Sequence, residues 1–228
     1  MNMQKFWIVL LVVFSLCIHV VYAVDDVNKK VGTSSAQFLK IPVGARPAAL
    51  ADSQVAIADD ANAILVNPAG AGFLYSPELQ AMHGQLLGDL YYNFAGYIHP
   101  TKIGSFGVAV QHLGGSELTK IVNGVKNGSF TAYDAAGTLN YALQVHQLIS
   151  AGINAKLIQS KLDDDSASAG AVDLGIKLRT PNEMFSFGLT GQHIGSSMKF
   201  NDESDPLPTM IRTGFGMKLD LPEHHSLI

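Results

Sequence analysis

The 228-residue sequence has a single cysteine and few charged residues. Cys17 lies inside an apolar N-terminal run, so the rest of the chain offers neither a disulfide pair nor a thiolate ligand for a metal. Charged residues make up 15% of the chain, against about 25% in an ordinary soluble domain. The net charge is only -4, and no Lys/Arg cluster marks a nucleic-acid surface. We therefore exclude a disulfide scaffold and predict that nucleic acid is not a partner.

The sequence also lacks a catalytic or metal-binding constellation. Asp163-Asp164-Asp165 lacks the alternating ligands and the Gly of a calcium loop, and it is typical of a solvated hairpin tip. The stretch GGSEL at 114–118 lacks the second Gly of a nucleophile elbow. No two histidines have the helical spacing of a metal-ligand pair, and most lie at the ends of predicted strands. We predict no enzymatic activity, no metal and no cofactor.

The N-terminus has the pattern of an export signal. Lys5 gives a positive start, 6–20 is almost unbroken apolar sequence, and Val21-Tyr22-Ala23 has the small last residue that signal peptidase requires. A membrane anchor is the alternative, but the run is shorter than the roughly 20 residues that a bilayer span needs. We predict a cleaved signal peptide at 1–23.

The exported part is rich in glycine, and no later segment is long and apolar enough to form a membrane helix. An exported chain of this kind is typical of a transmembrane β-barrel or of an extracytoplasmic β-sandwich. We therefore predict an all-β, antiparallel fold. The pattern of the strands decides between a barrel and a sandwich.

Apolar and polar residues alternate with a period of two through most of the second half of the chain. Between 135 and 146, Leu139, Tyr141 and Leu143 share one face, and Asn140 and Gln144 lie on the other. The eight predicted strands are 77–86, 89–99, 103–113, 134–146, 148–160, 170–180, 183–194 and 208–220. Most of them match the roughly 9 to 11 residues that a tilted strand needs to cross hydrocarbon.

The connections and the polar faces favour a barrel over a sandwich. Predicted turns near 100–102, 147, 181–182 and 222–223 are short, whereas the loops 114–133, 161–169 and 195–207 are longer. Outer-membrane barrels have short turns on one side of the membrane and long loops on the other. The polar faces carry mostly Ser, Gly, Asn, Gln and Thr, which suits a crowded or plugged lumen better than a water-facing surface.

A compact helical element precedes the strands. Asp59 or Asp60 can cap a turn at 61–65, and Asn67 can cap a second turn with Pro68 at its first position. We predict that 24–75 forms a hatch, a segment that plugs the lumen of a barrel formed by 76–228.

Residues 32–72 carry a set of short motifs, among them Gly32-Thr33-Ser34, Gln37-Phe38-Leu39 and the stretch ADDANAILVNPAG. On these motifs the segment resembles the N-terminal region of PorV/PorQ-type proteins, and ADDANAILVNPAG is similar to the hatch of the wider FadL-like long-chain fatty acid transporter barrels. The hatch positions that carry the resemblance are Gly44, Arg46, Asp59, Asp60, Asn67, Pro68 and Gly70. The chain departs from the common pattern after Arg46, where it has Pro47-Ala48-Ala49.

The resemblance implies a barrel in the bacterial outer membrane, in contact with outer-membrane lipid. It implies either an accessory of type IX protein secretion, with secreted cargo proteins and secretion components as partners, or a channel for long-chain fatty acids and other hydrophobic small molecules.

Several charged residues lie on the predicted inward face of the strands. They are Lys156, Asp173, Lys177, Arg179 and Arg212, followed by Lys218 and Asp220. They can line a polar path or pin the hatch, and we favour pinning. Because the interior of an eight-stranded barrel holds only side chains or one small ligand, we also expect the natural chain to continue past residue 228 into a larger barrel.

Overall fold

The computed structural model describes residues 34–201, 203–221 and 225–227. The chain divides into two units, Met1–Ser34 and Ser35–Ile228, and every element given below lies in the second. The predicted signal peptide at 1–23 and the predicted turn at 222–223 lie outside the described residues. None of the helices in the described ranges has the length and apolar character needed to cross a membrane.

Residues 34–75, the described part of the segment predicted to be a hatch, form a series of short helical turns, and we keep the name hatch for this segment. These are η2 (Gln37–Lys40), α2 (Ala45–Ala49), α3 (Ala63–Val66) and η3 (Pro68–Phe73). A helix of four to six residues has few internal hydrogen bonds, so such turns depend on capping groups and on packing against the rest of the molecule.

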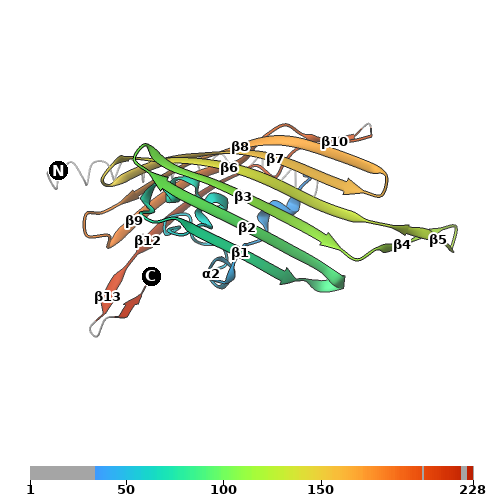
Figure 1. Ribbon diagram of the computed structural model, residues 1–228, viewed down its shortest axis with the longest axis horizontal. Helices are drawn as coiled ribbons and strands as arrows, with labels where there is room; N and C mark the ends of the chain where they lie inside the picture. The colour runs from blue at the N-terminus through green and yellow to red at the C-terminus, as the bar shows by residue number, and fades with distance from the viewer. Residues whose placement is uncertain (1–33, 202, 222–224, 228) are drawn as a thin grey trace, which may run out of the picture. The chain divides into compact units, whose positions relative to one another are not determined.

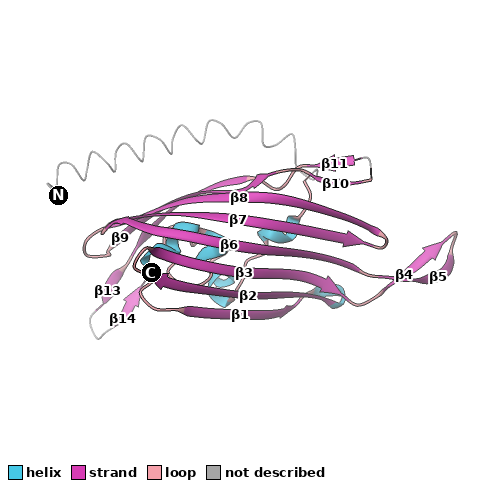
Figure 2. Ribbon diagram, turned by 45° about the horizontal axis from the view of Figure 1, so that its top comes forward, coloured by secondary structure: helices cyan, strands magenta, loops and turns pink. Residues whose placement is uncertain are grey.

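Eight long strands follow and form one antiparallel sheet, as predicted. They are β1 (Glu78–Gln85), β2 (Leu90–Thr101), β3 (Gly104–Gly115), β6 (Ala132–His146), β7 (Ile149–Leu162), β8 (Asp165–Arg179), β9 (Phe185–Gly195) and β12 (Met210–Met217), in that spatial order. A single turn, η4 (Leu87–Asp89), joins β1 to β2. The sheet curves around the short helices of the hatch (Figures 1 and 2).

The connections differ from the prediction. The predicted loop 114–133 contains a hairpin of β4 (Leu118–Val122) and β5 (Val125–Phe130). The predicted loop 161–169 is wrong, because β7 and β8 continue through it to a two-residue turn at Asp163-Asp164. The predicted loop 195–207 contains the short pair β10 (Met198–Phe200) and β11 (Glu203–Asp205). The eighth strand ends at Met217, and β13 (Leu219–Leu221) pairs instead with β14 (His225–Leu227).

The two faces of the sheet have the reverse of the polarity found in a soluble protein. Leu139, Leu157 and Leu174 are 65%, 77% and 52% exposed, whereas Asn140 and Asp173 on the opposite face are 4% and 0% exposed. We call the apolar, exposed side the outer face and the polar, buried side the inner face. The inner face is the one that contacts the hatch.

A β-bulge interrupts the pairing of β8 with β9. The register shifts between Val172 and Leu174, so that Gln192 and His193 together oppose Asp173. His193 has a φ of 57°, which is unusual for a residue other than glycine. Gln192 faces inward by the regular alternation of β9, and the bulge turns His193 inward as well, so both side chains are buried.

Aromatic rings form two rows on the outer face. At the end of the sheet near the β4–β5 hairpin, four rings from adjacent strands stack with centroids 5.8 to 6.3 Å apart; these are His83, Tyr91, His112 and Tyr133. The opposite end carries the pairs Tyr97–His99, Phe106–Tyr141 and Phe185–Phe215. Apolar side chains such as Val108, Val110 and Leu139 lie between the rows on their strands.

Candidate functional site: the contact between the hatch and the sheet

The hatch forms its turns close to the residues that the sequence indicates, although α3 spans Ala63–Val66 and not the predicted 61–65. The Oδ1 atom of Asp60 accepts a hydrogen bond from the amide of Asn62 at 3.0 Å, just before α3. Asn67 caps η3 as predicted, because its Oδ1 accepts from the amide of Ala69 at 3.1 Å and Pro68 occupies the first helical position. Local side chains therefore satisfy part of the hydrogen bonding at the start of these turns, and the sheet supplies the rest.

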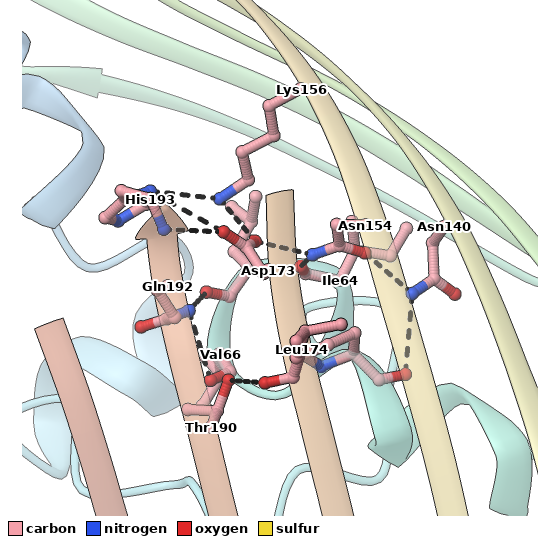
Figure 3. Close-up of polar contacts among 12 residues, drawn as sticks. Ile64, Val66, Asn140, Asn154, Lys156, Asp173, Leu174, Thr190, Gln192 and His193 are labelled. Atoms are coloured by element: carbon pink, nitrogen blue, oxygen red, sulfur yellow. Dashed lines mark hydrogen bonds and ion pairs between the residues drawn. The ribbon is translucent and has the colours of Figure 1, made fainter. Parts of the chain in front are cut away.

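The inner face supplies hydrogen-bond donors for hatch carbonyls. Because α3 is a single turn, its last carbonyl groups have few partners within the helix. Asn154 Nδ2 donates to the carbonyl of Ile64 at 2.6 Å, and Gln192 Nε2 donates to that of Leu65 at the same distance (Figure 3). Further donations run from Asn140 to Pro68 at 3.4 Å and from Ser150 to Ala69 at 2.8 Å. Side chains of the sheet thus complete the short helices of the hatch.

Asn67 holds the centre of this contact. Its side chain is fully buried. Its Nδ2 donates to the carbonyl of Val55 in the hatch at 2.9 Å and to that of Ile176 in β8 at 3.2 Å. One amide therefore caps η3, joins two parts of the hatch and binds the hatch to the sheet.

Glycines on the inner face allow the hatch to approach the sheet backbone. A Cβ atom on Gly152 would lie 2.4 Å from the backbone carbon of Pro68, and one on Gly175 would lie 2.2 Å from Asn67 Oδ1. A Cβ on Gly188 would lie 2.1 Å from the carbonyl oxygen of Val55. Within the hatch, a Cβ on Gly70 would lie 2.6 Å from the carbonyl oxygen of Ala58. Side chains at these positions would occupy space that the hatch fills.

We expect Gly152→Val to displace the hatch, because the added side chain meets backbone atoms that cannot rotate away. Overpacking of this kind costs about 1 to 3 kcal/mol. The measurement is the rate at which proteinase K cleaves between residues 45 and 75, which should rise several-fold. Gly137→Val is the matched control, because a Cβ there meets no atom within 4 Å. Equal cleavage rates in the two variants would contradict this close approach.

Three of the seven predicted inward-facing charges contact the hatch. Lys218 and Asp220 lie past Met217, where the last strand of the sheet ends. Lys177 Nζ donates to the carbonyl of Ala58 at 2.5 Å. Arg212 pairs with the Asp52 carboxylate at 2.9 Å and also donates to the Asp52 carbonyl. The Arg179 guanidinium lies 4.1 Å from the ring centroid of Phe73 and donates to the Tyr75 hydroxyl at 2.6 Å. These contacts are those expected of residues that pin the hatch.

Two more of the predicted charges, Lys156 and Asp173, pair with each other on the inner face of the sheet. Lys156 Nζ lies 2.7 Å from Asp173 Oδ2, and the two side chains are 1% and 0% exposed. Asp173 also accepts from Asn154 Nδ2 at 2.7 Å and from the amide of His193 at 2.8 Å (Figure 3). Lys156 Nζ lies 3.3 Å from His193 Nδ1. Because an ammonium group can only donate, Nδ1 accepts and the imidazole is neutral.

His193 is the member of this cluster that sequence reasoning missed. Strict alternation through β9 places His193 on the same face as Phe185, Phe187 and Leu189, which is the outer one. The bulge reverses this and directs His193 inward. No pattern in the sequence marks the bulge.

Arginines balance the carboxylates of the hatch. Arg46 Nη1 lies 2.5 Å from Asp59 and 3.6 Å from Asp60. Burial raises the pKa of Asp60, and the charge of Arg46 opposes this shift without cancelling it. Burial likewise raises the pKa of Asp52, against the opposing charge of Arg212. Burial lowers the pKa of Arg46, but the hydrogen bond and charge of Asp59 outweigh it and leave that pKa raised. In each case the charge of the arginine favours the ionised form of a half-buried carboxylate.

Gly44 lies beside this group at the start of α2. Its φ of 98° is open to glycine and strained for other residues, and its amide donates to Met82 Sδ in β1 at 3.0 Å. The seven hatch positions selected from the sequence therefore divide between turn formation, ion pairing and close packing.

Comparison with known proteins gives one family match. The model of an uncharacterised protein family (UPF0164) matches residues 19–157, which is more than half of the chain and includes the hatch and the first strands. No curated protein matches the chain.

Proposed function

The chain belongs to the UPF0164 family, and we propose that it is a bacterial outer-membrane β-barrel protein whose lumen is closed by the hatch. The observation that carries the proposal is the reversed polarity of the sheet. Leu157, Leu174 and many other apolar side chains are exposed on the outer face, while Asn154, Asp173 and Lys177 are buried on the inner face. Water would disfavour such an outer face, whereas a lipid bilayer requires it.

The aromatic rows add independent support. Outer-membrane barrels carry an apolar band about 25 Å tall with aromatic girdles at both edges. From Tyr133 to Tyr141 in β6 there are eight residue steps, which correspond to about 26 Å along a strand and about 20 Å across a membrane at a usual tilt. The spacing of the rows is therefore about 5 Å less than the height of the apolar band, which supports a girdle at each edge of it.

A barrel requires strands long enough to cross the bilayer and a partner for every strand edge. β2, β3, β6, β7, β8 and β9 have 11 to 15 residues, enough to cross a bilayer. Within the described residues, β1 and β12 are the edges of the sheet. Lipid does not tolerate unpaired strand edges, so a barrel requires that both edges pair.

The test is the location of the mature protein in the cell. We expect it to sediment with the outer membrane and to migrate on a gel with a mobility that changes on heating, because folded barrels resist the detergent. A periplasmic marker protein serves as the control. Recovery of the chain as a soluble monomer with that marker would end the barrel proposal.

Within this setting, the function that we favour is an accessory of type IX protein secretion, of PorV/PorQ type. The β4–β5 hairpin projects beyond the sheet (Figure 1), and Leu118, Ile121 and Val125 on it are 47%, 65% and 68% exposed. Exposed apolar side chains of this kind are typical of sites that bind other proteins. Because the hatch is fixed to the sheet, it blocks the passage of solutes through the barrel. Binding of protein partners at the hairpin is therefore the mode of action that we favour.

The experiment for this function is the capture of C-terminal domains of type IX cargo by the purified protein. We expect binding to be lost when Ile121 and Val125 are both changed to Asn and to be retained in Thr119→Asn, a control on the same hairpin. Binding that survives the double change would remove the hairpin from the mechanism. Absence of cargo binding by the native protein would refute the secretion function.

The alternative is a FadL-like channel for long-chain fatty acids or other hydrophobic compounds. It is favoured by apolar residues on the inner face near the hairpin end, where Ile158, Ala169 and Met198 belong to one cluster with Phe38 and Leu39 of the hatch. If the hatch segment moved aside, this region would offer an apolar surface inside the barrel.

Bound lipid distinguishes the alternative. Mass spectrometry of the purified protein should then detect a long-chain acid, which Ala169→Trp should displace by filling the interior. Ala155→Trp, on the outer face, is the control that should leave the lipid in place. Protein free of such lipids would favour the secretion function.

A further inference from the structure

A small cavity lies between the hatch and one side of the sheet. Its volume is about 40 Å³. The hatch contributes Asn62 and Val66, β3 contributes Gln111, β9 contributes Gln192, and β12 contributes Arg212. The cavity therefore lies where strands from both halves of the sheet meet the same part of the hatch.

Two buried amides around this cavity have polar atoms without a partner in the described part of the chain. The Asn62 side chain is fully buried, and neither its Oδ1 nor its Nδ2 has a hydrogen bond there. Gln111 is 2% exposed; its Nε2 donates to the Tyr92 hydroxyl at 2.7 Å, but its Oε1 has no donor among the described residues. Buried polar atoms are rarely left in this state, because a group removed from water without a new partner loses the hydrogen bonds that water gave it.

The chemistry of these atoms restricts what can occupy the cavity. Asn62 presents donors and an acceptor, and Gln111 presents an acceptor. A metal cation would leave the Asn62 NH₂ group unpaired and would lie close to Arg212. An anion would leave the Gln111 oxygen unpaired. Only a small neutral molecule that both donates and accepts can satisfy both amides.

We propose that this cavity binds a cluster of water molecules that joins Asn62 of the hatch to Gln111 of β3. A buried water needs about 10 to 15 Å³ of such volume, so about three molecules fit the 40 Å³ available. On the β6–β8 side, Asn140, Ser150 and Asn154 bond the hatch directly. Between Asn62 and Gln111 there is no direct hydrogen bond, and the water cluster provides the polar link between the hatch and β3.

Radiolytic hydroxyl-radical footprinting of the full chain in detergent tests the proposal, because bound water generates radicals beside buried side chains. Val66 and Ile64 both lie in α3 and are 4% and 0% exposed, but only Val66 lines the cavity. We expect Val66 to be oxidised several-fold faster than Ile64. Asn62→Leu and, independently, Gln111→Leu should reduce the rate at Val66 to that at Ile64.

Other outcomes overturn the proposal. Equal slow oxidation of Val66 and Ile64 in the native protein would mean a dry cavity, and this comparison needs no variant. A rise of several degrees in the unfolding temperature of Asn62→Leu would mean that the native amide is unpaired. If Val66 were still oxidised fast in both variants, the bound water would be held by groups other than the amides of Asn62 and Gln111. The test does not depend on membrane location, so it is separate from the proposed function.

Discussion

Lys156→Met is expected to lower the free energy of unfolding by about 3 to 5 kcal/mol, because it leaves a buried carboxylate without its counter-ion. The native ammonium lies 2.7 Å from Asp173 Oδ2 with both side chains almost completely buried. Methionine has a similar length and removes only the charge and the hydrogen bonds. Denaturant unfolding in lipid vesicles gives the measurement.

The double variant Lys156→Met with Asp173→Asn separates charge from packing. A neutral amide at 173 no longer needs the ammonium, so most of the lost stability should return. Lys126→Met, on the exposed β5 strand, should stay within about 0.5 kcal/mol of the native protein. If Lys156→Met were as mild as Lys126→Met, the buried ion pair would contribute nothing to the fold.

The same ion pair supports the bulge in β9. Asp173 accepts the amide of His193, whose backbone has a φ of 57°. Such a conformation persists only where surrounding contacts enforce it. Lys156 keeps Asp173 ionised, and the ionised carboxylate holds the bulge that turns His193 inward. Gln192, the residue just before His193, donates to the carbonyl of Leu65 in the hatch, so loss of Lys156 should also weaken the contact between hatch and sheet.

The strands were predictable because each one has an apolar, exposed face and a polar face that is buried against the hatch. Alternation placed Leu139 and Leu174 outward and Asn140 and Asp173 inward, and the structure agrees. The β4–β5 hairpin was missed although its signal was present. Asn123-Gly124 is a strong hairpin turn sequence, and both residues have positive φ in the structure. The error was to treat a region without one-sided alternation as a loop.

The contacts of the site were less predictable, because they join residues far apart in the chain. Asn67 was identified as a helix cap, but nothing near it in the sequence indicates its bond to Ile176. Gly152 and Gly175 looked like part of a glycine-rich polar face, whereas their role is to leave room for Pro68 and Asn67. A local pattern specifies a turn or a face, but the partner of an inner-face side chain depends on strand register, and a bulge changes that register.

Leu174→Arg is expected to destabilise the protein by about 2 to 4 kcal/mol if the outer face lies in lipid. Leu174 is 52% exposed near the middle of β8, where it pairs in register with Ile153 of β7 and Gly191 of β9. At an exposed site in water, the same change would cost no more than about 0.5 kcal/mol. The difference arises because the bilayer centre cannot solvate a guanidinium group.

Ile121→Arg is the matched control, since Ile121 is 65% exposed but lies on the projecting β4–β5 hairpin. Both changes replace an exposed aliphatic side chain with arginine, so only the surrounding medium differs. Folding into lipid vesicles, followed by denaturant titration, should show a large loss for Leu174→Arg and almost none for Ile121→Arg. Equal tolerance of both would mean that the outer face meets water, and the apolar strands would then need a protein partner instead of a membrane.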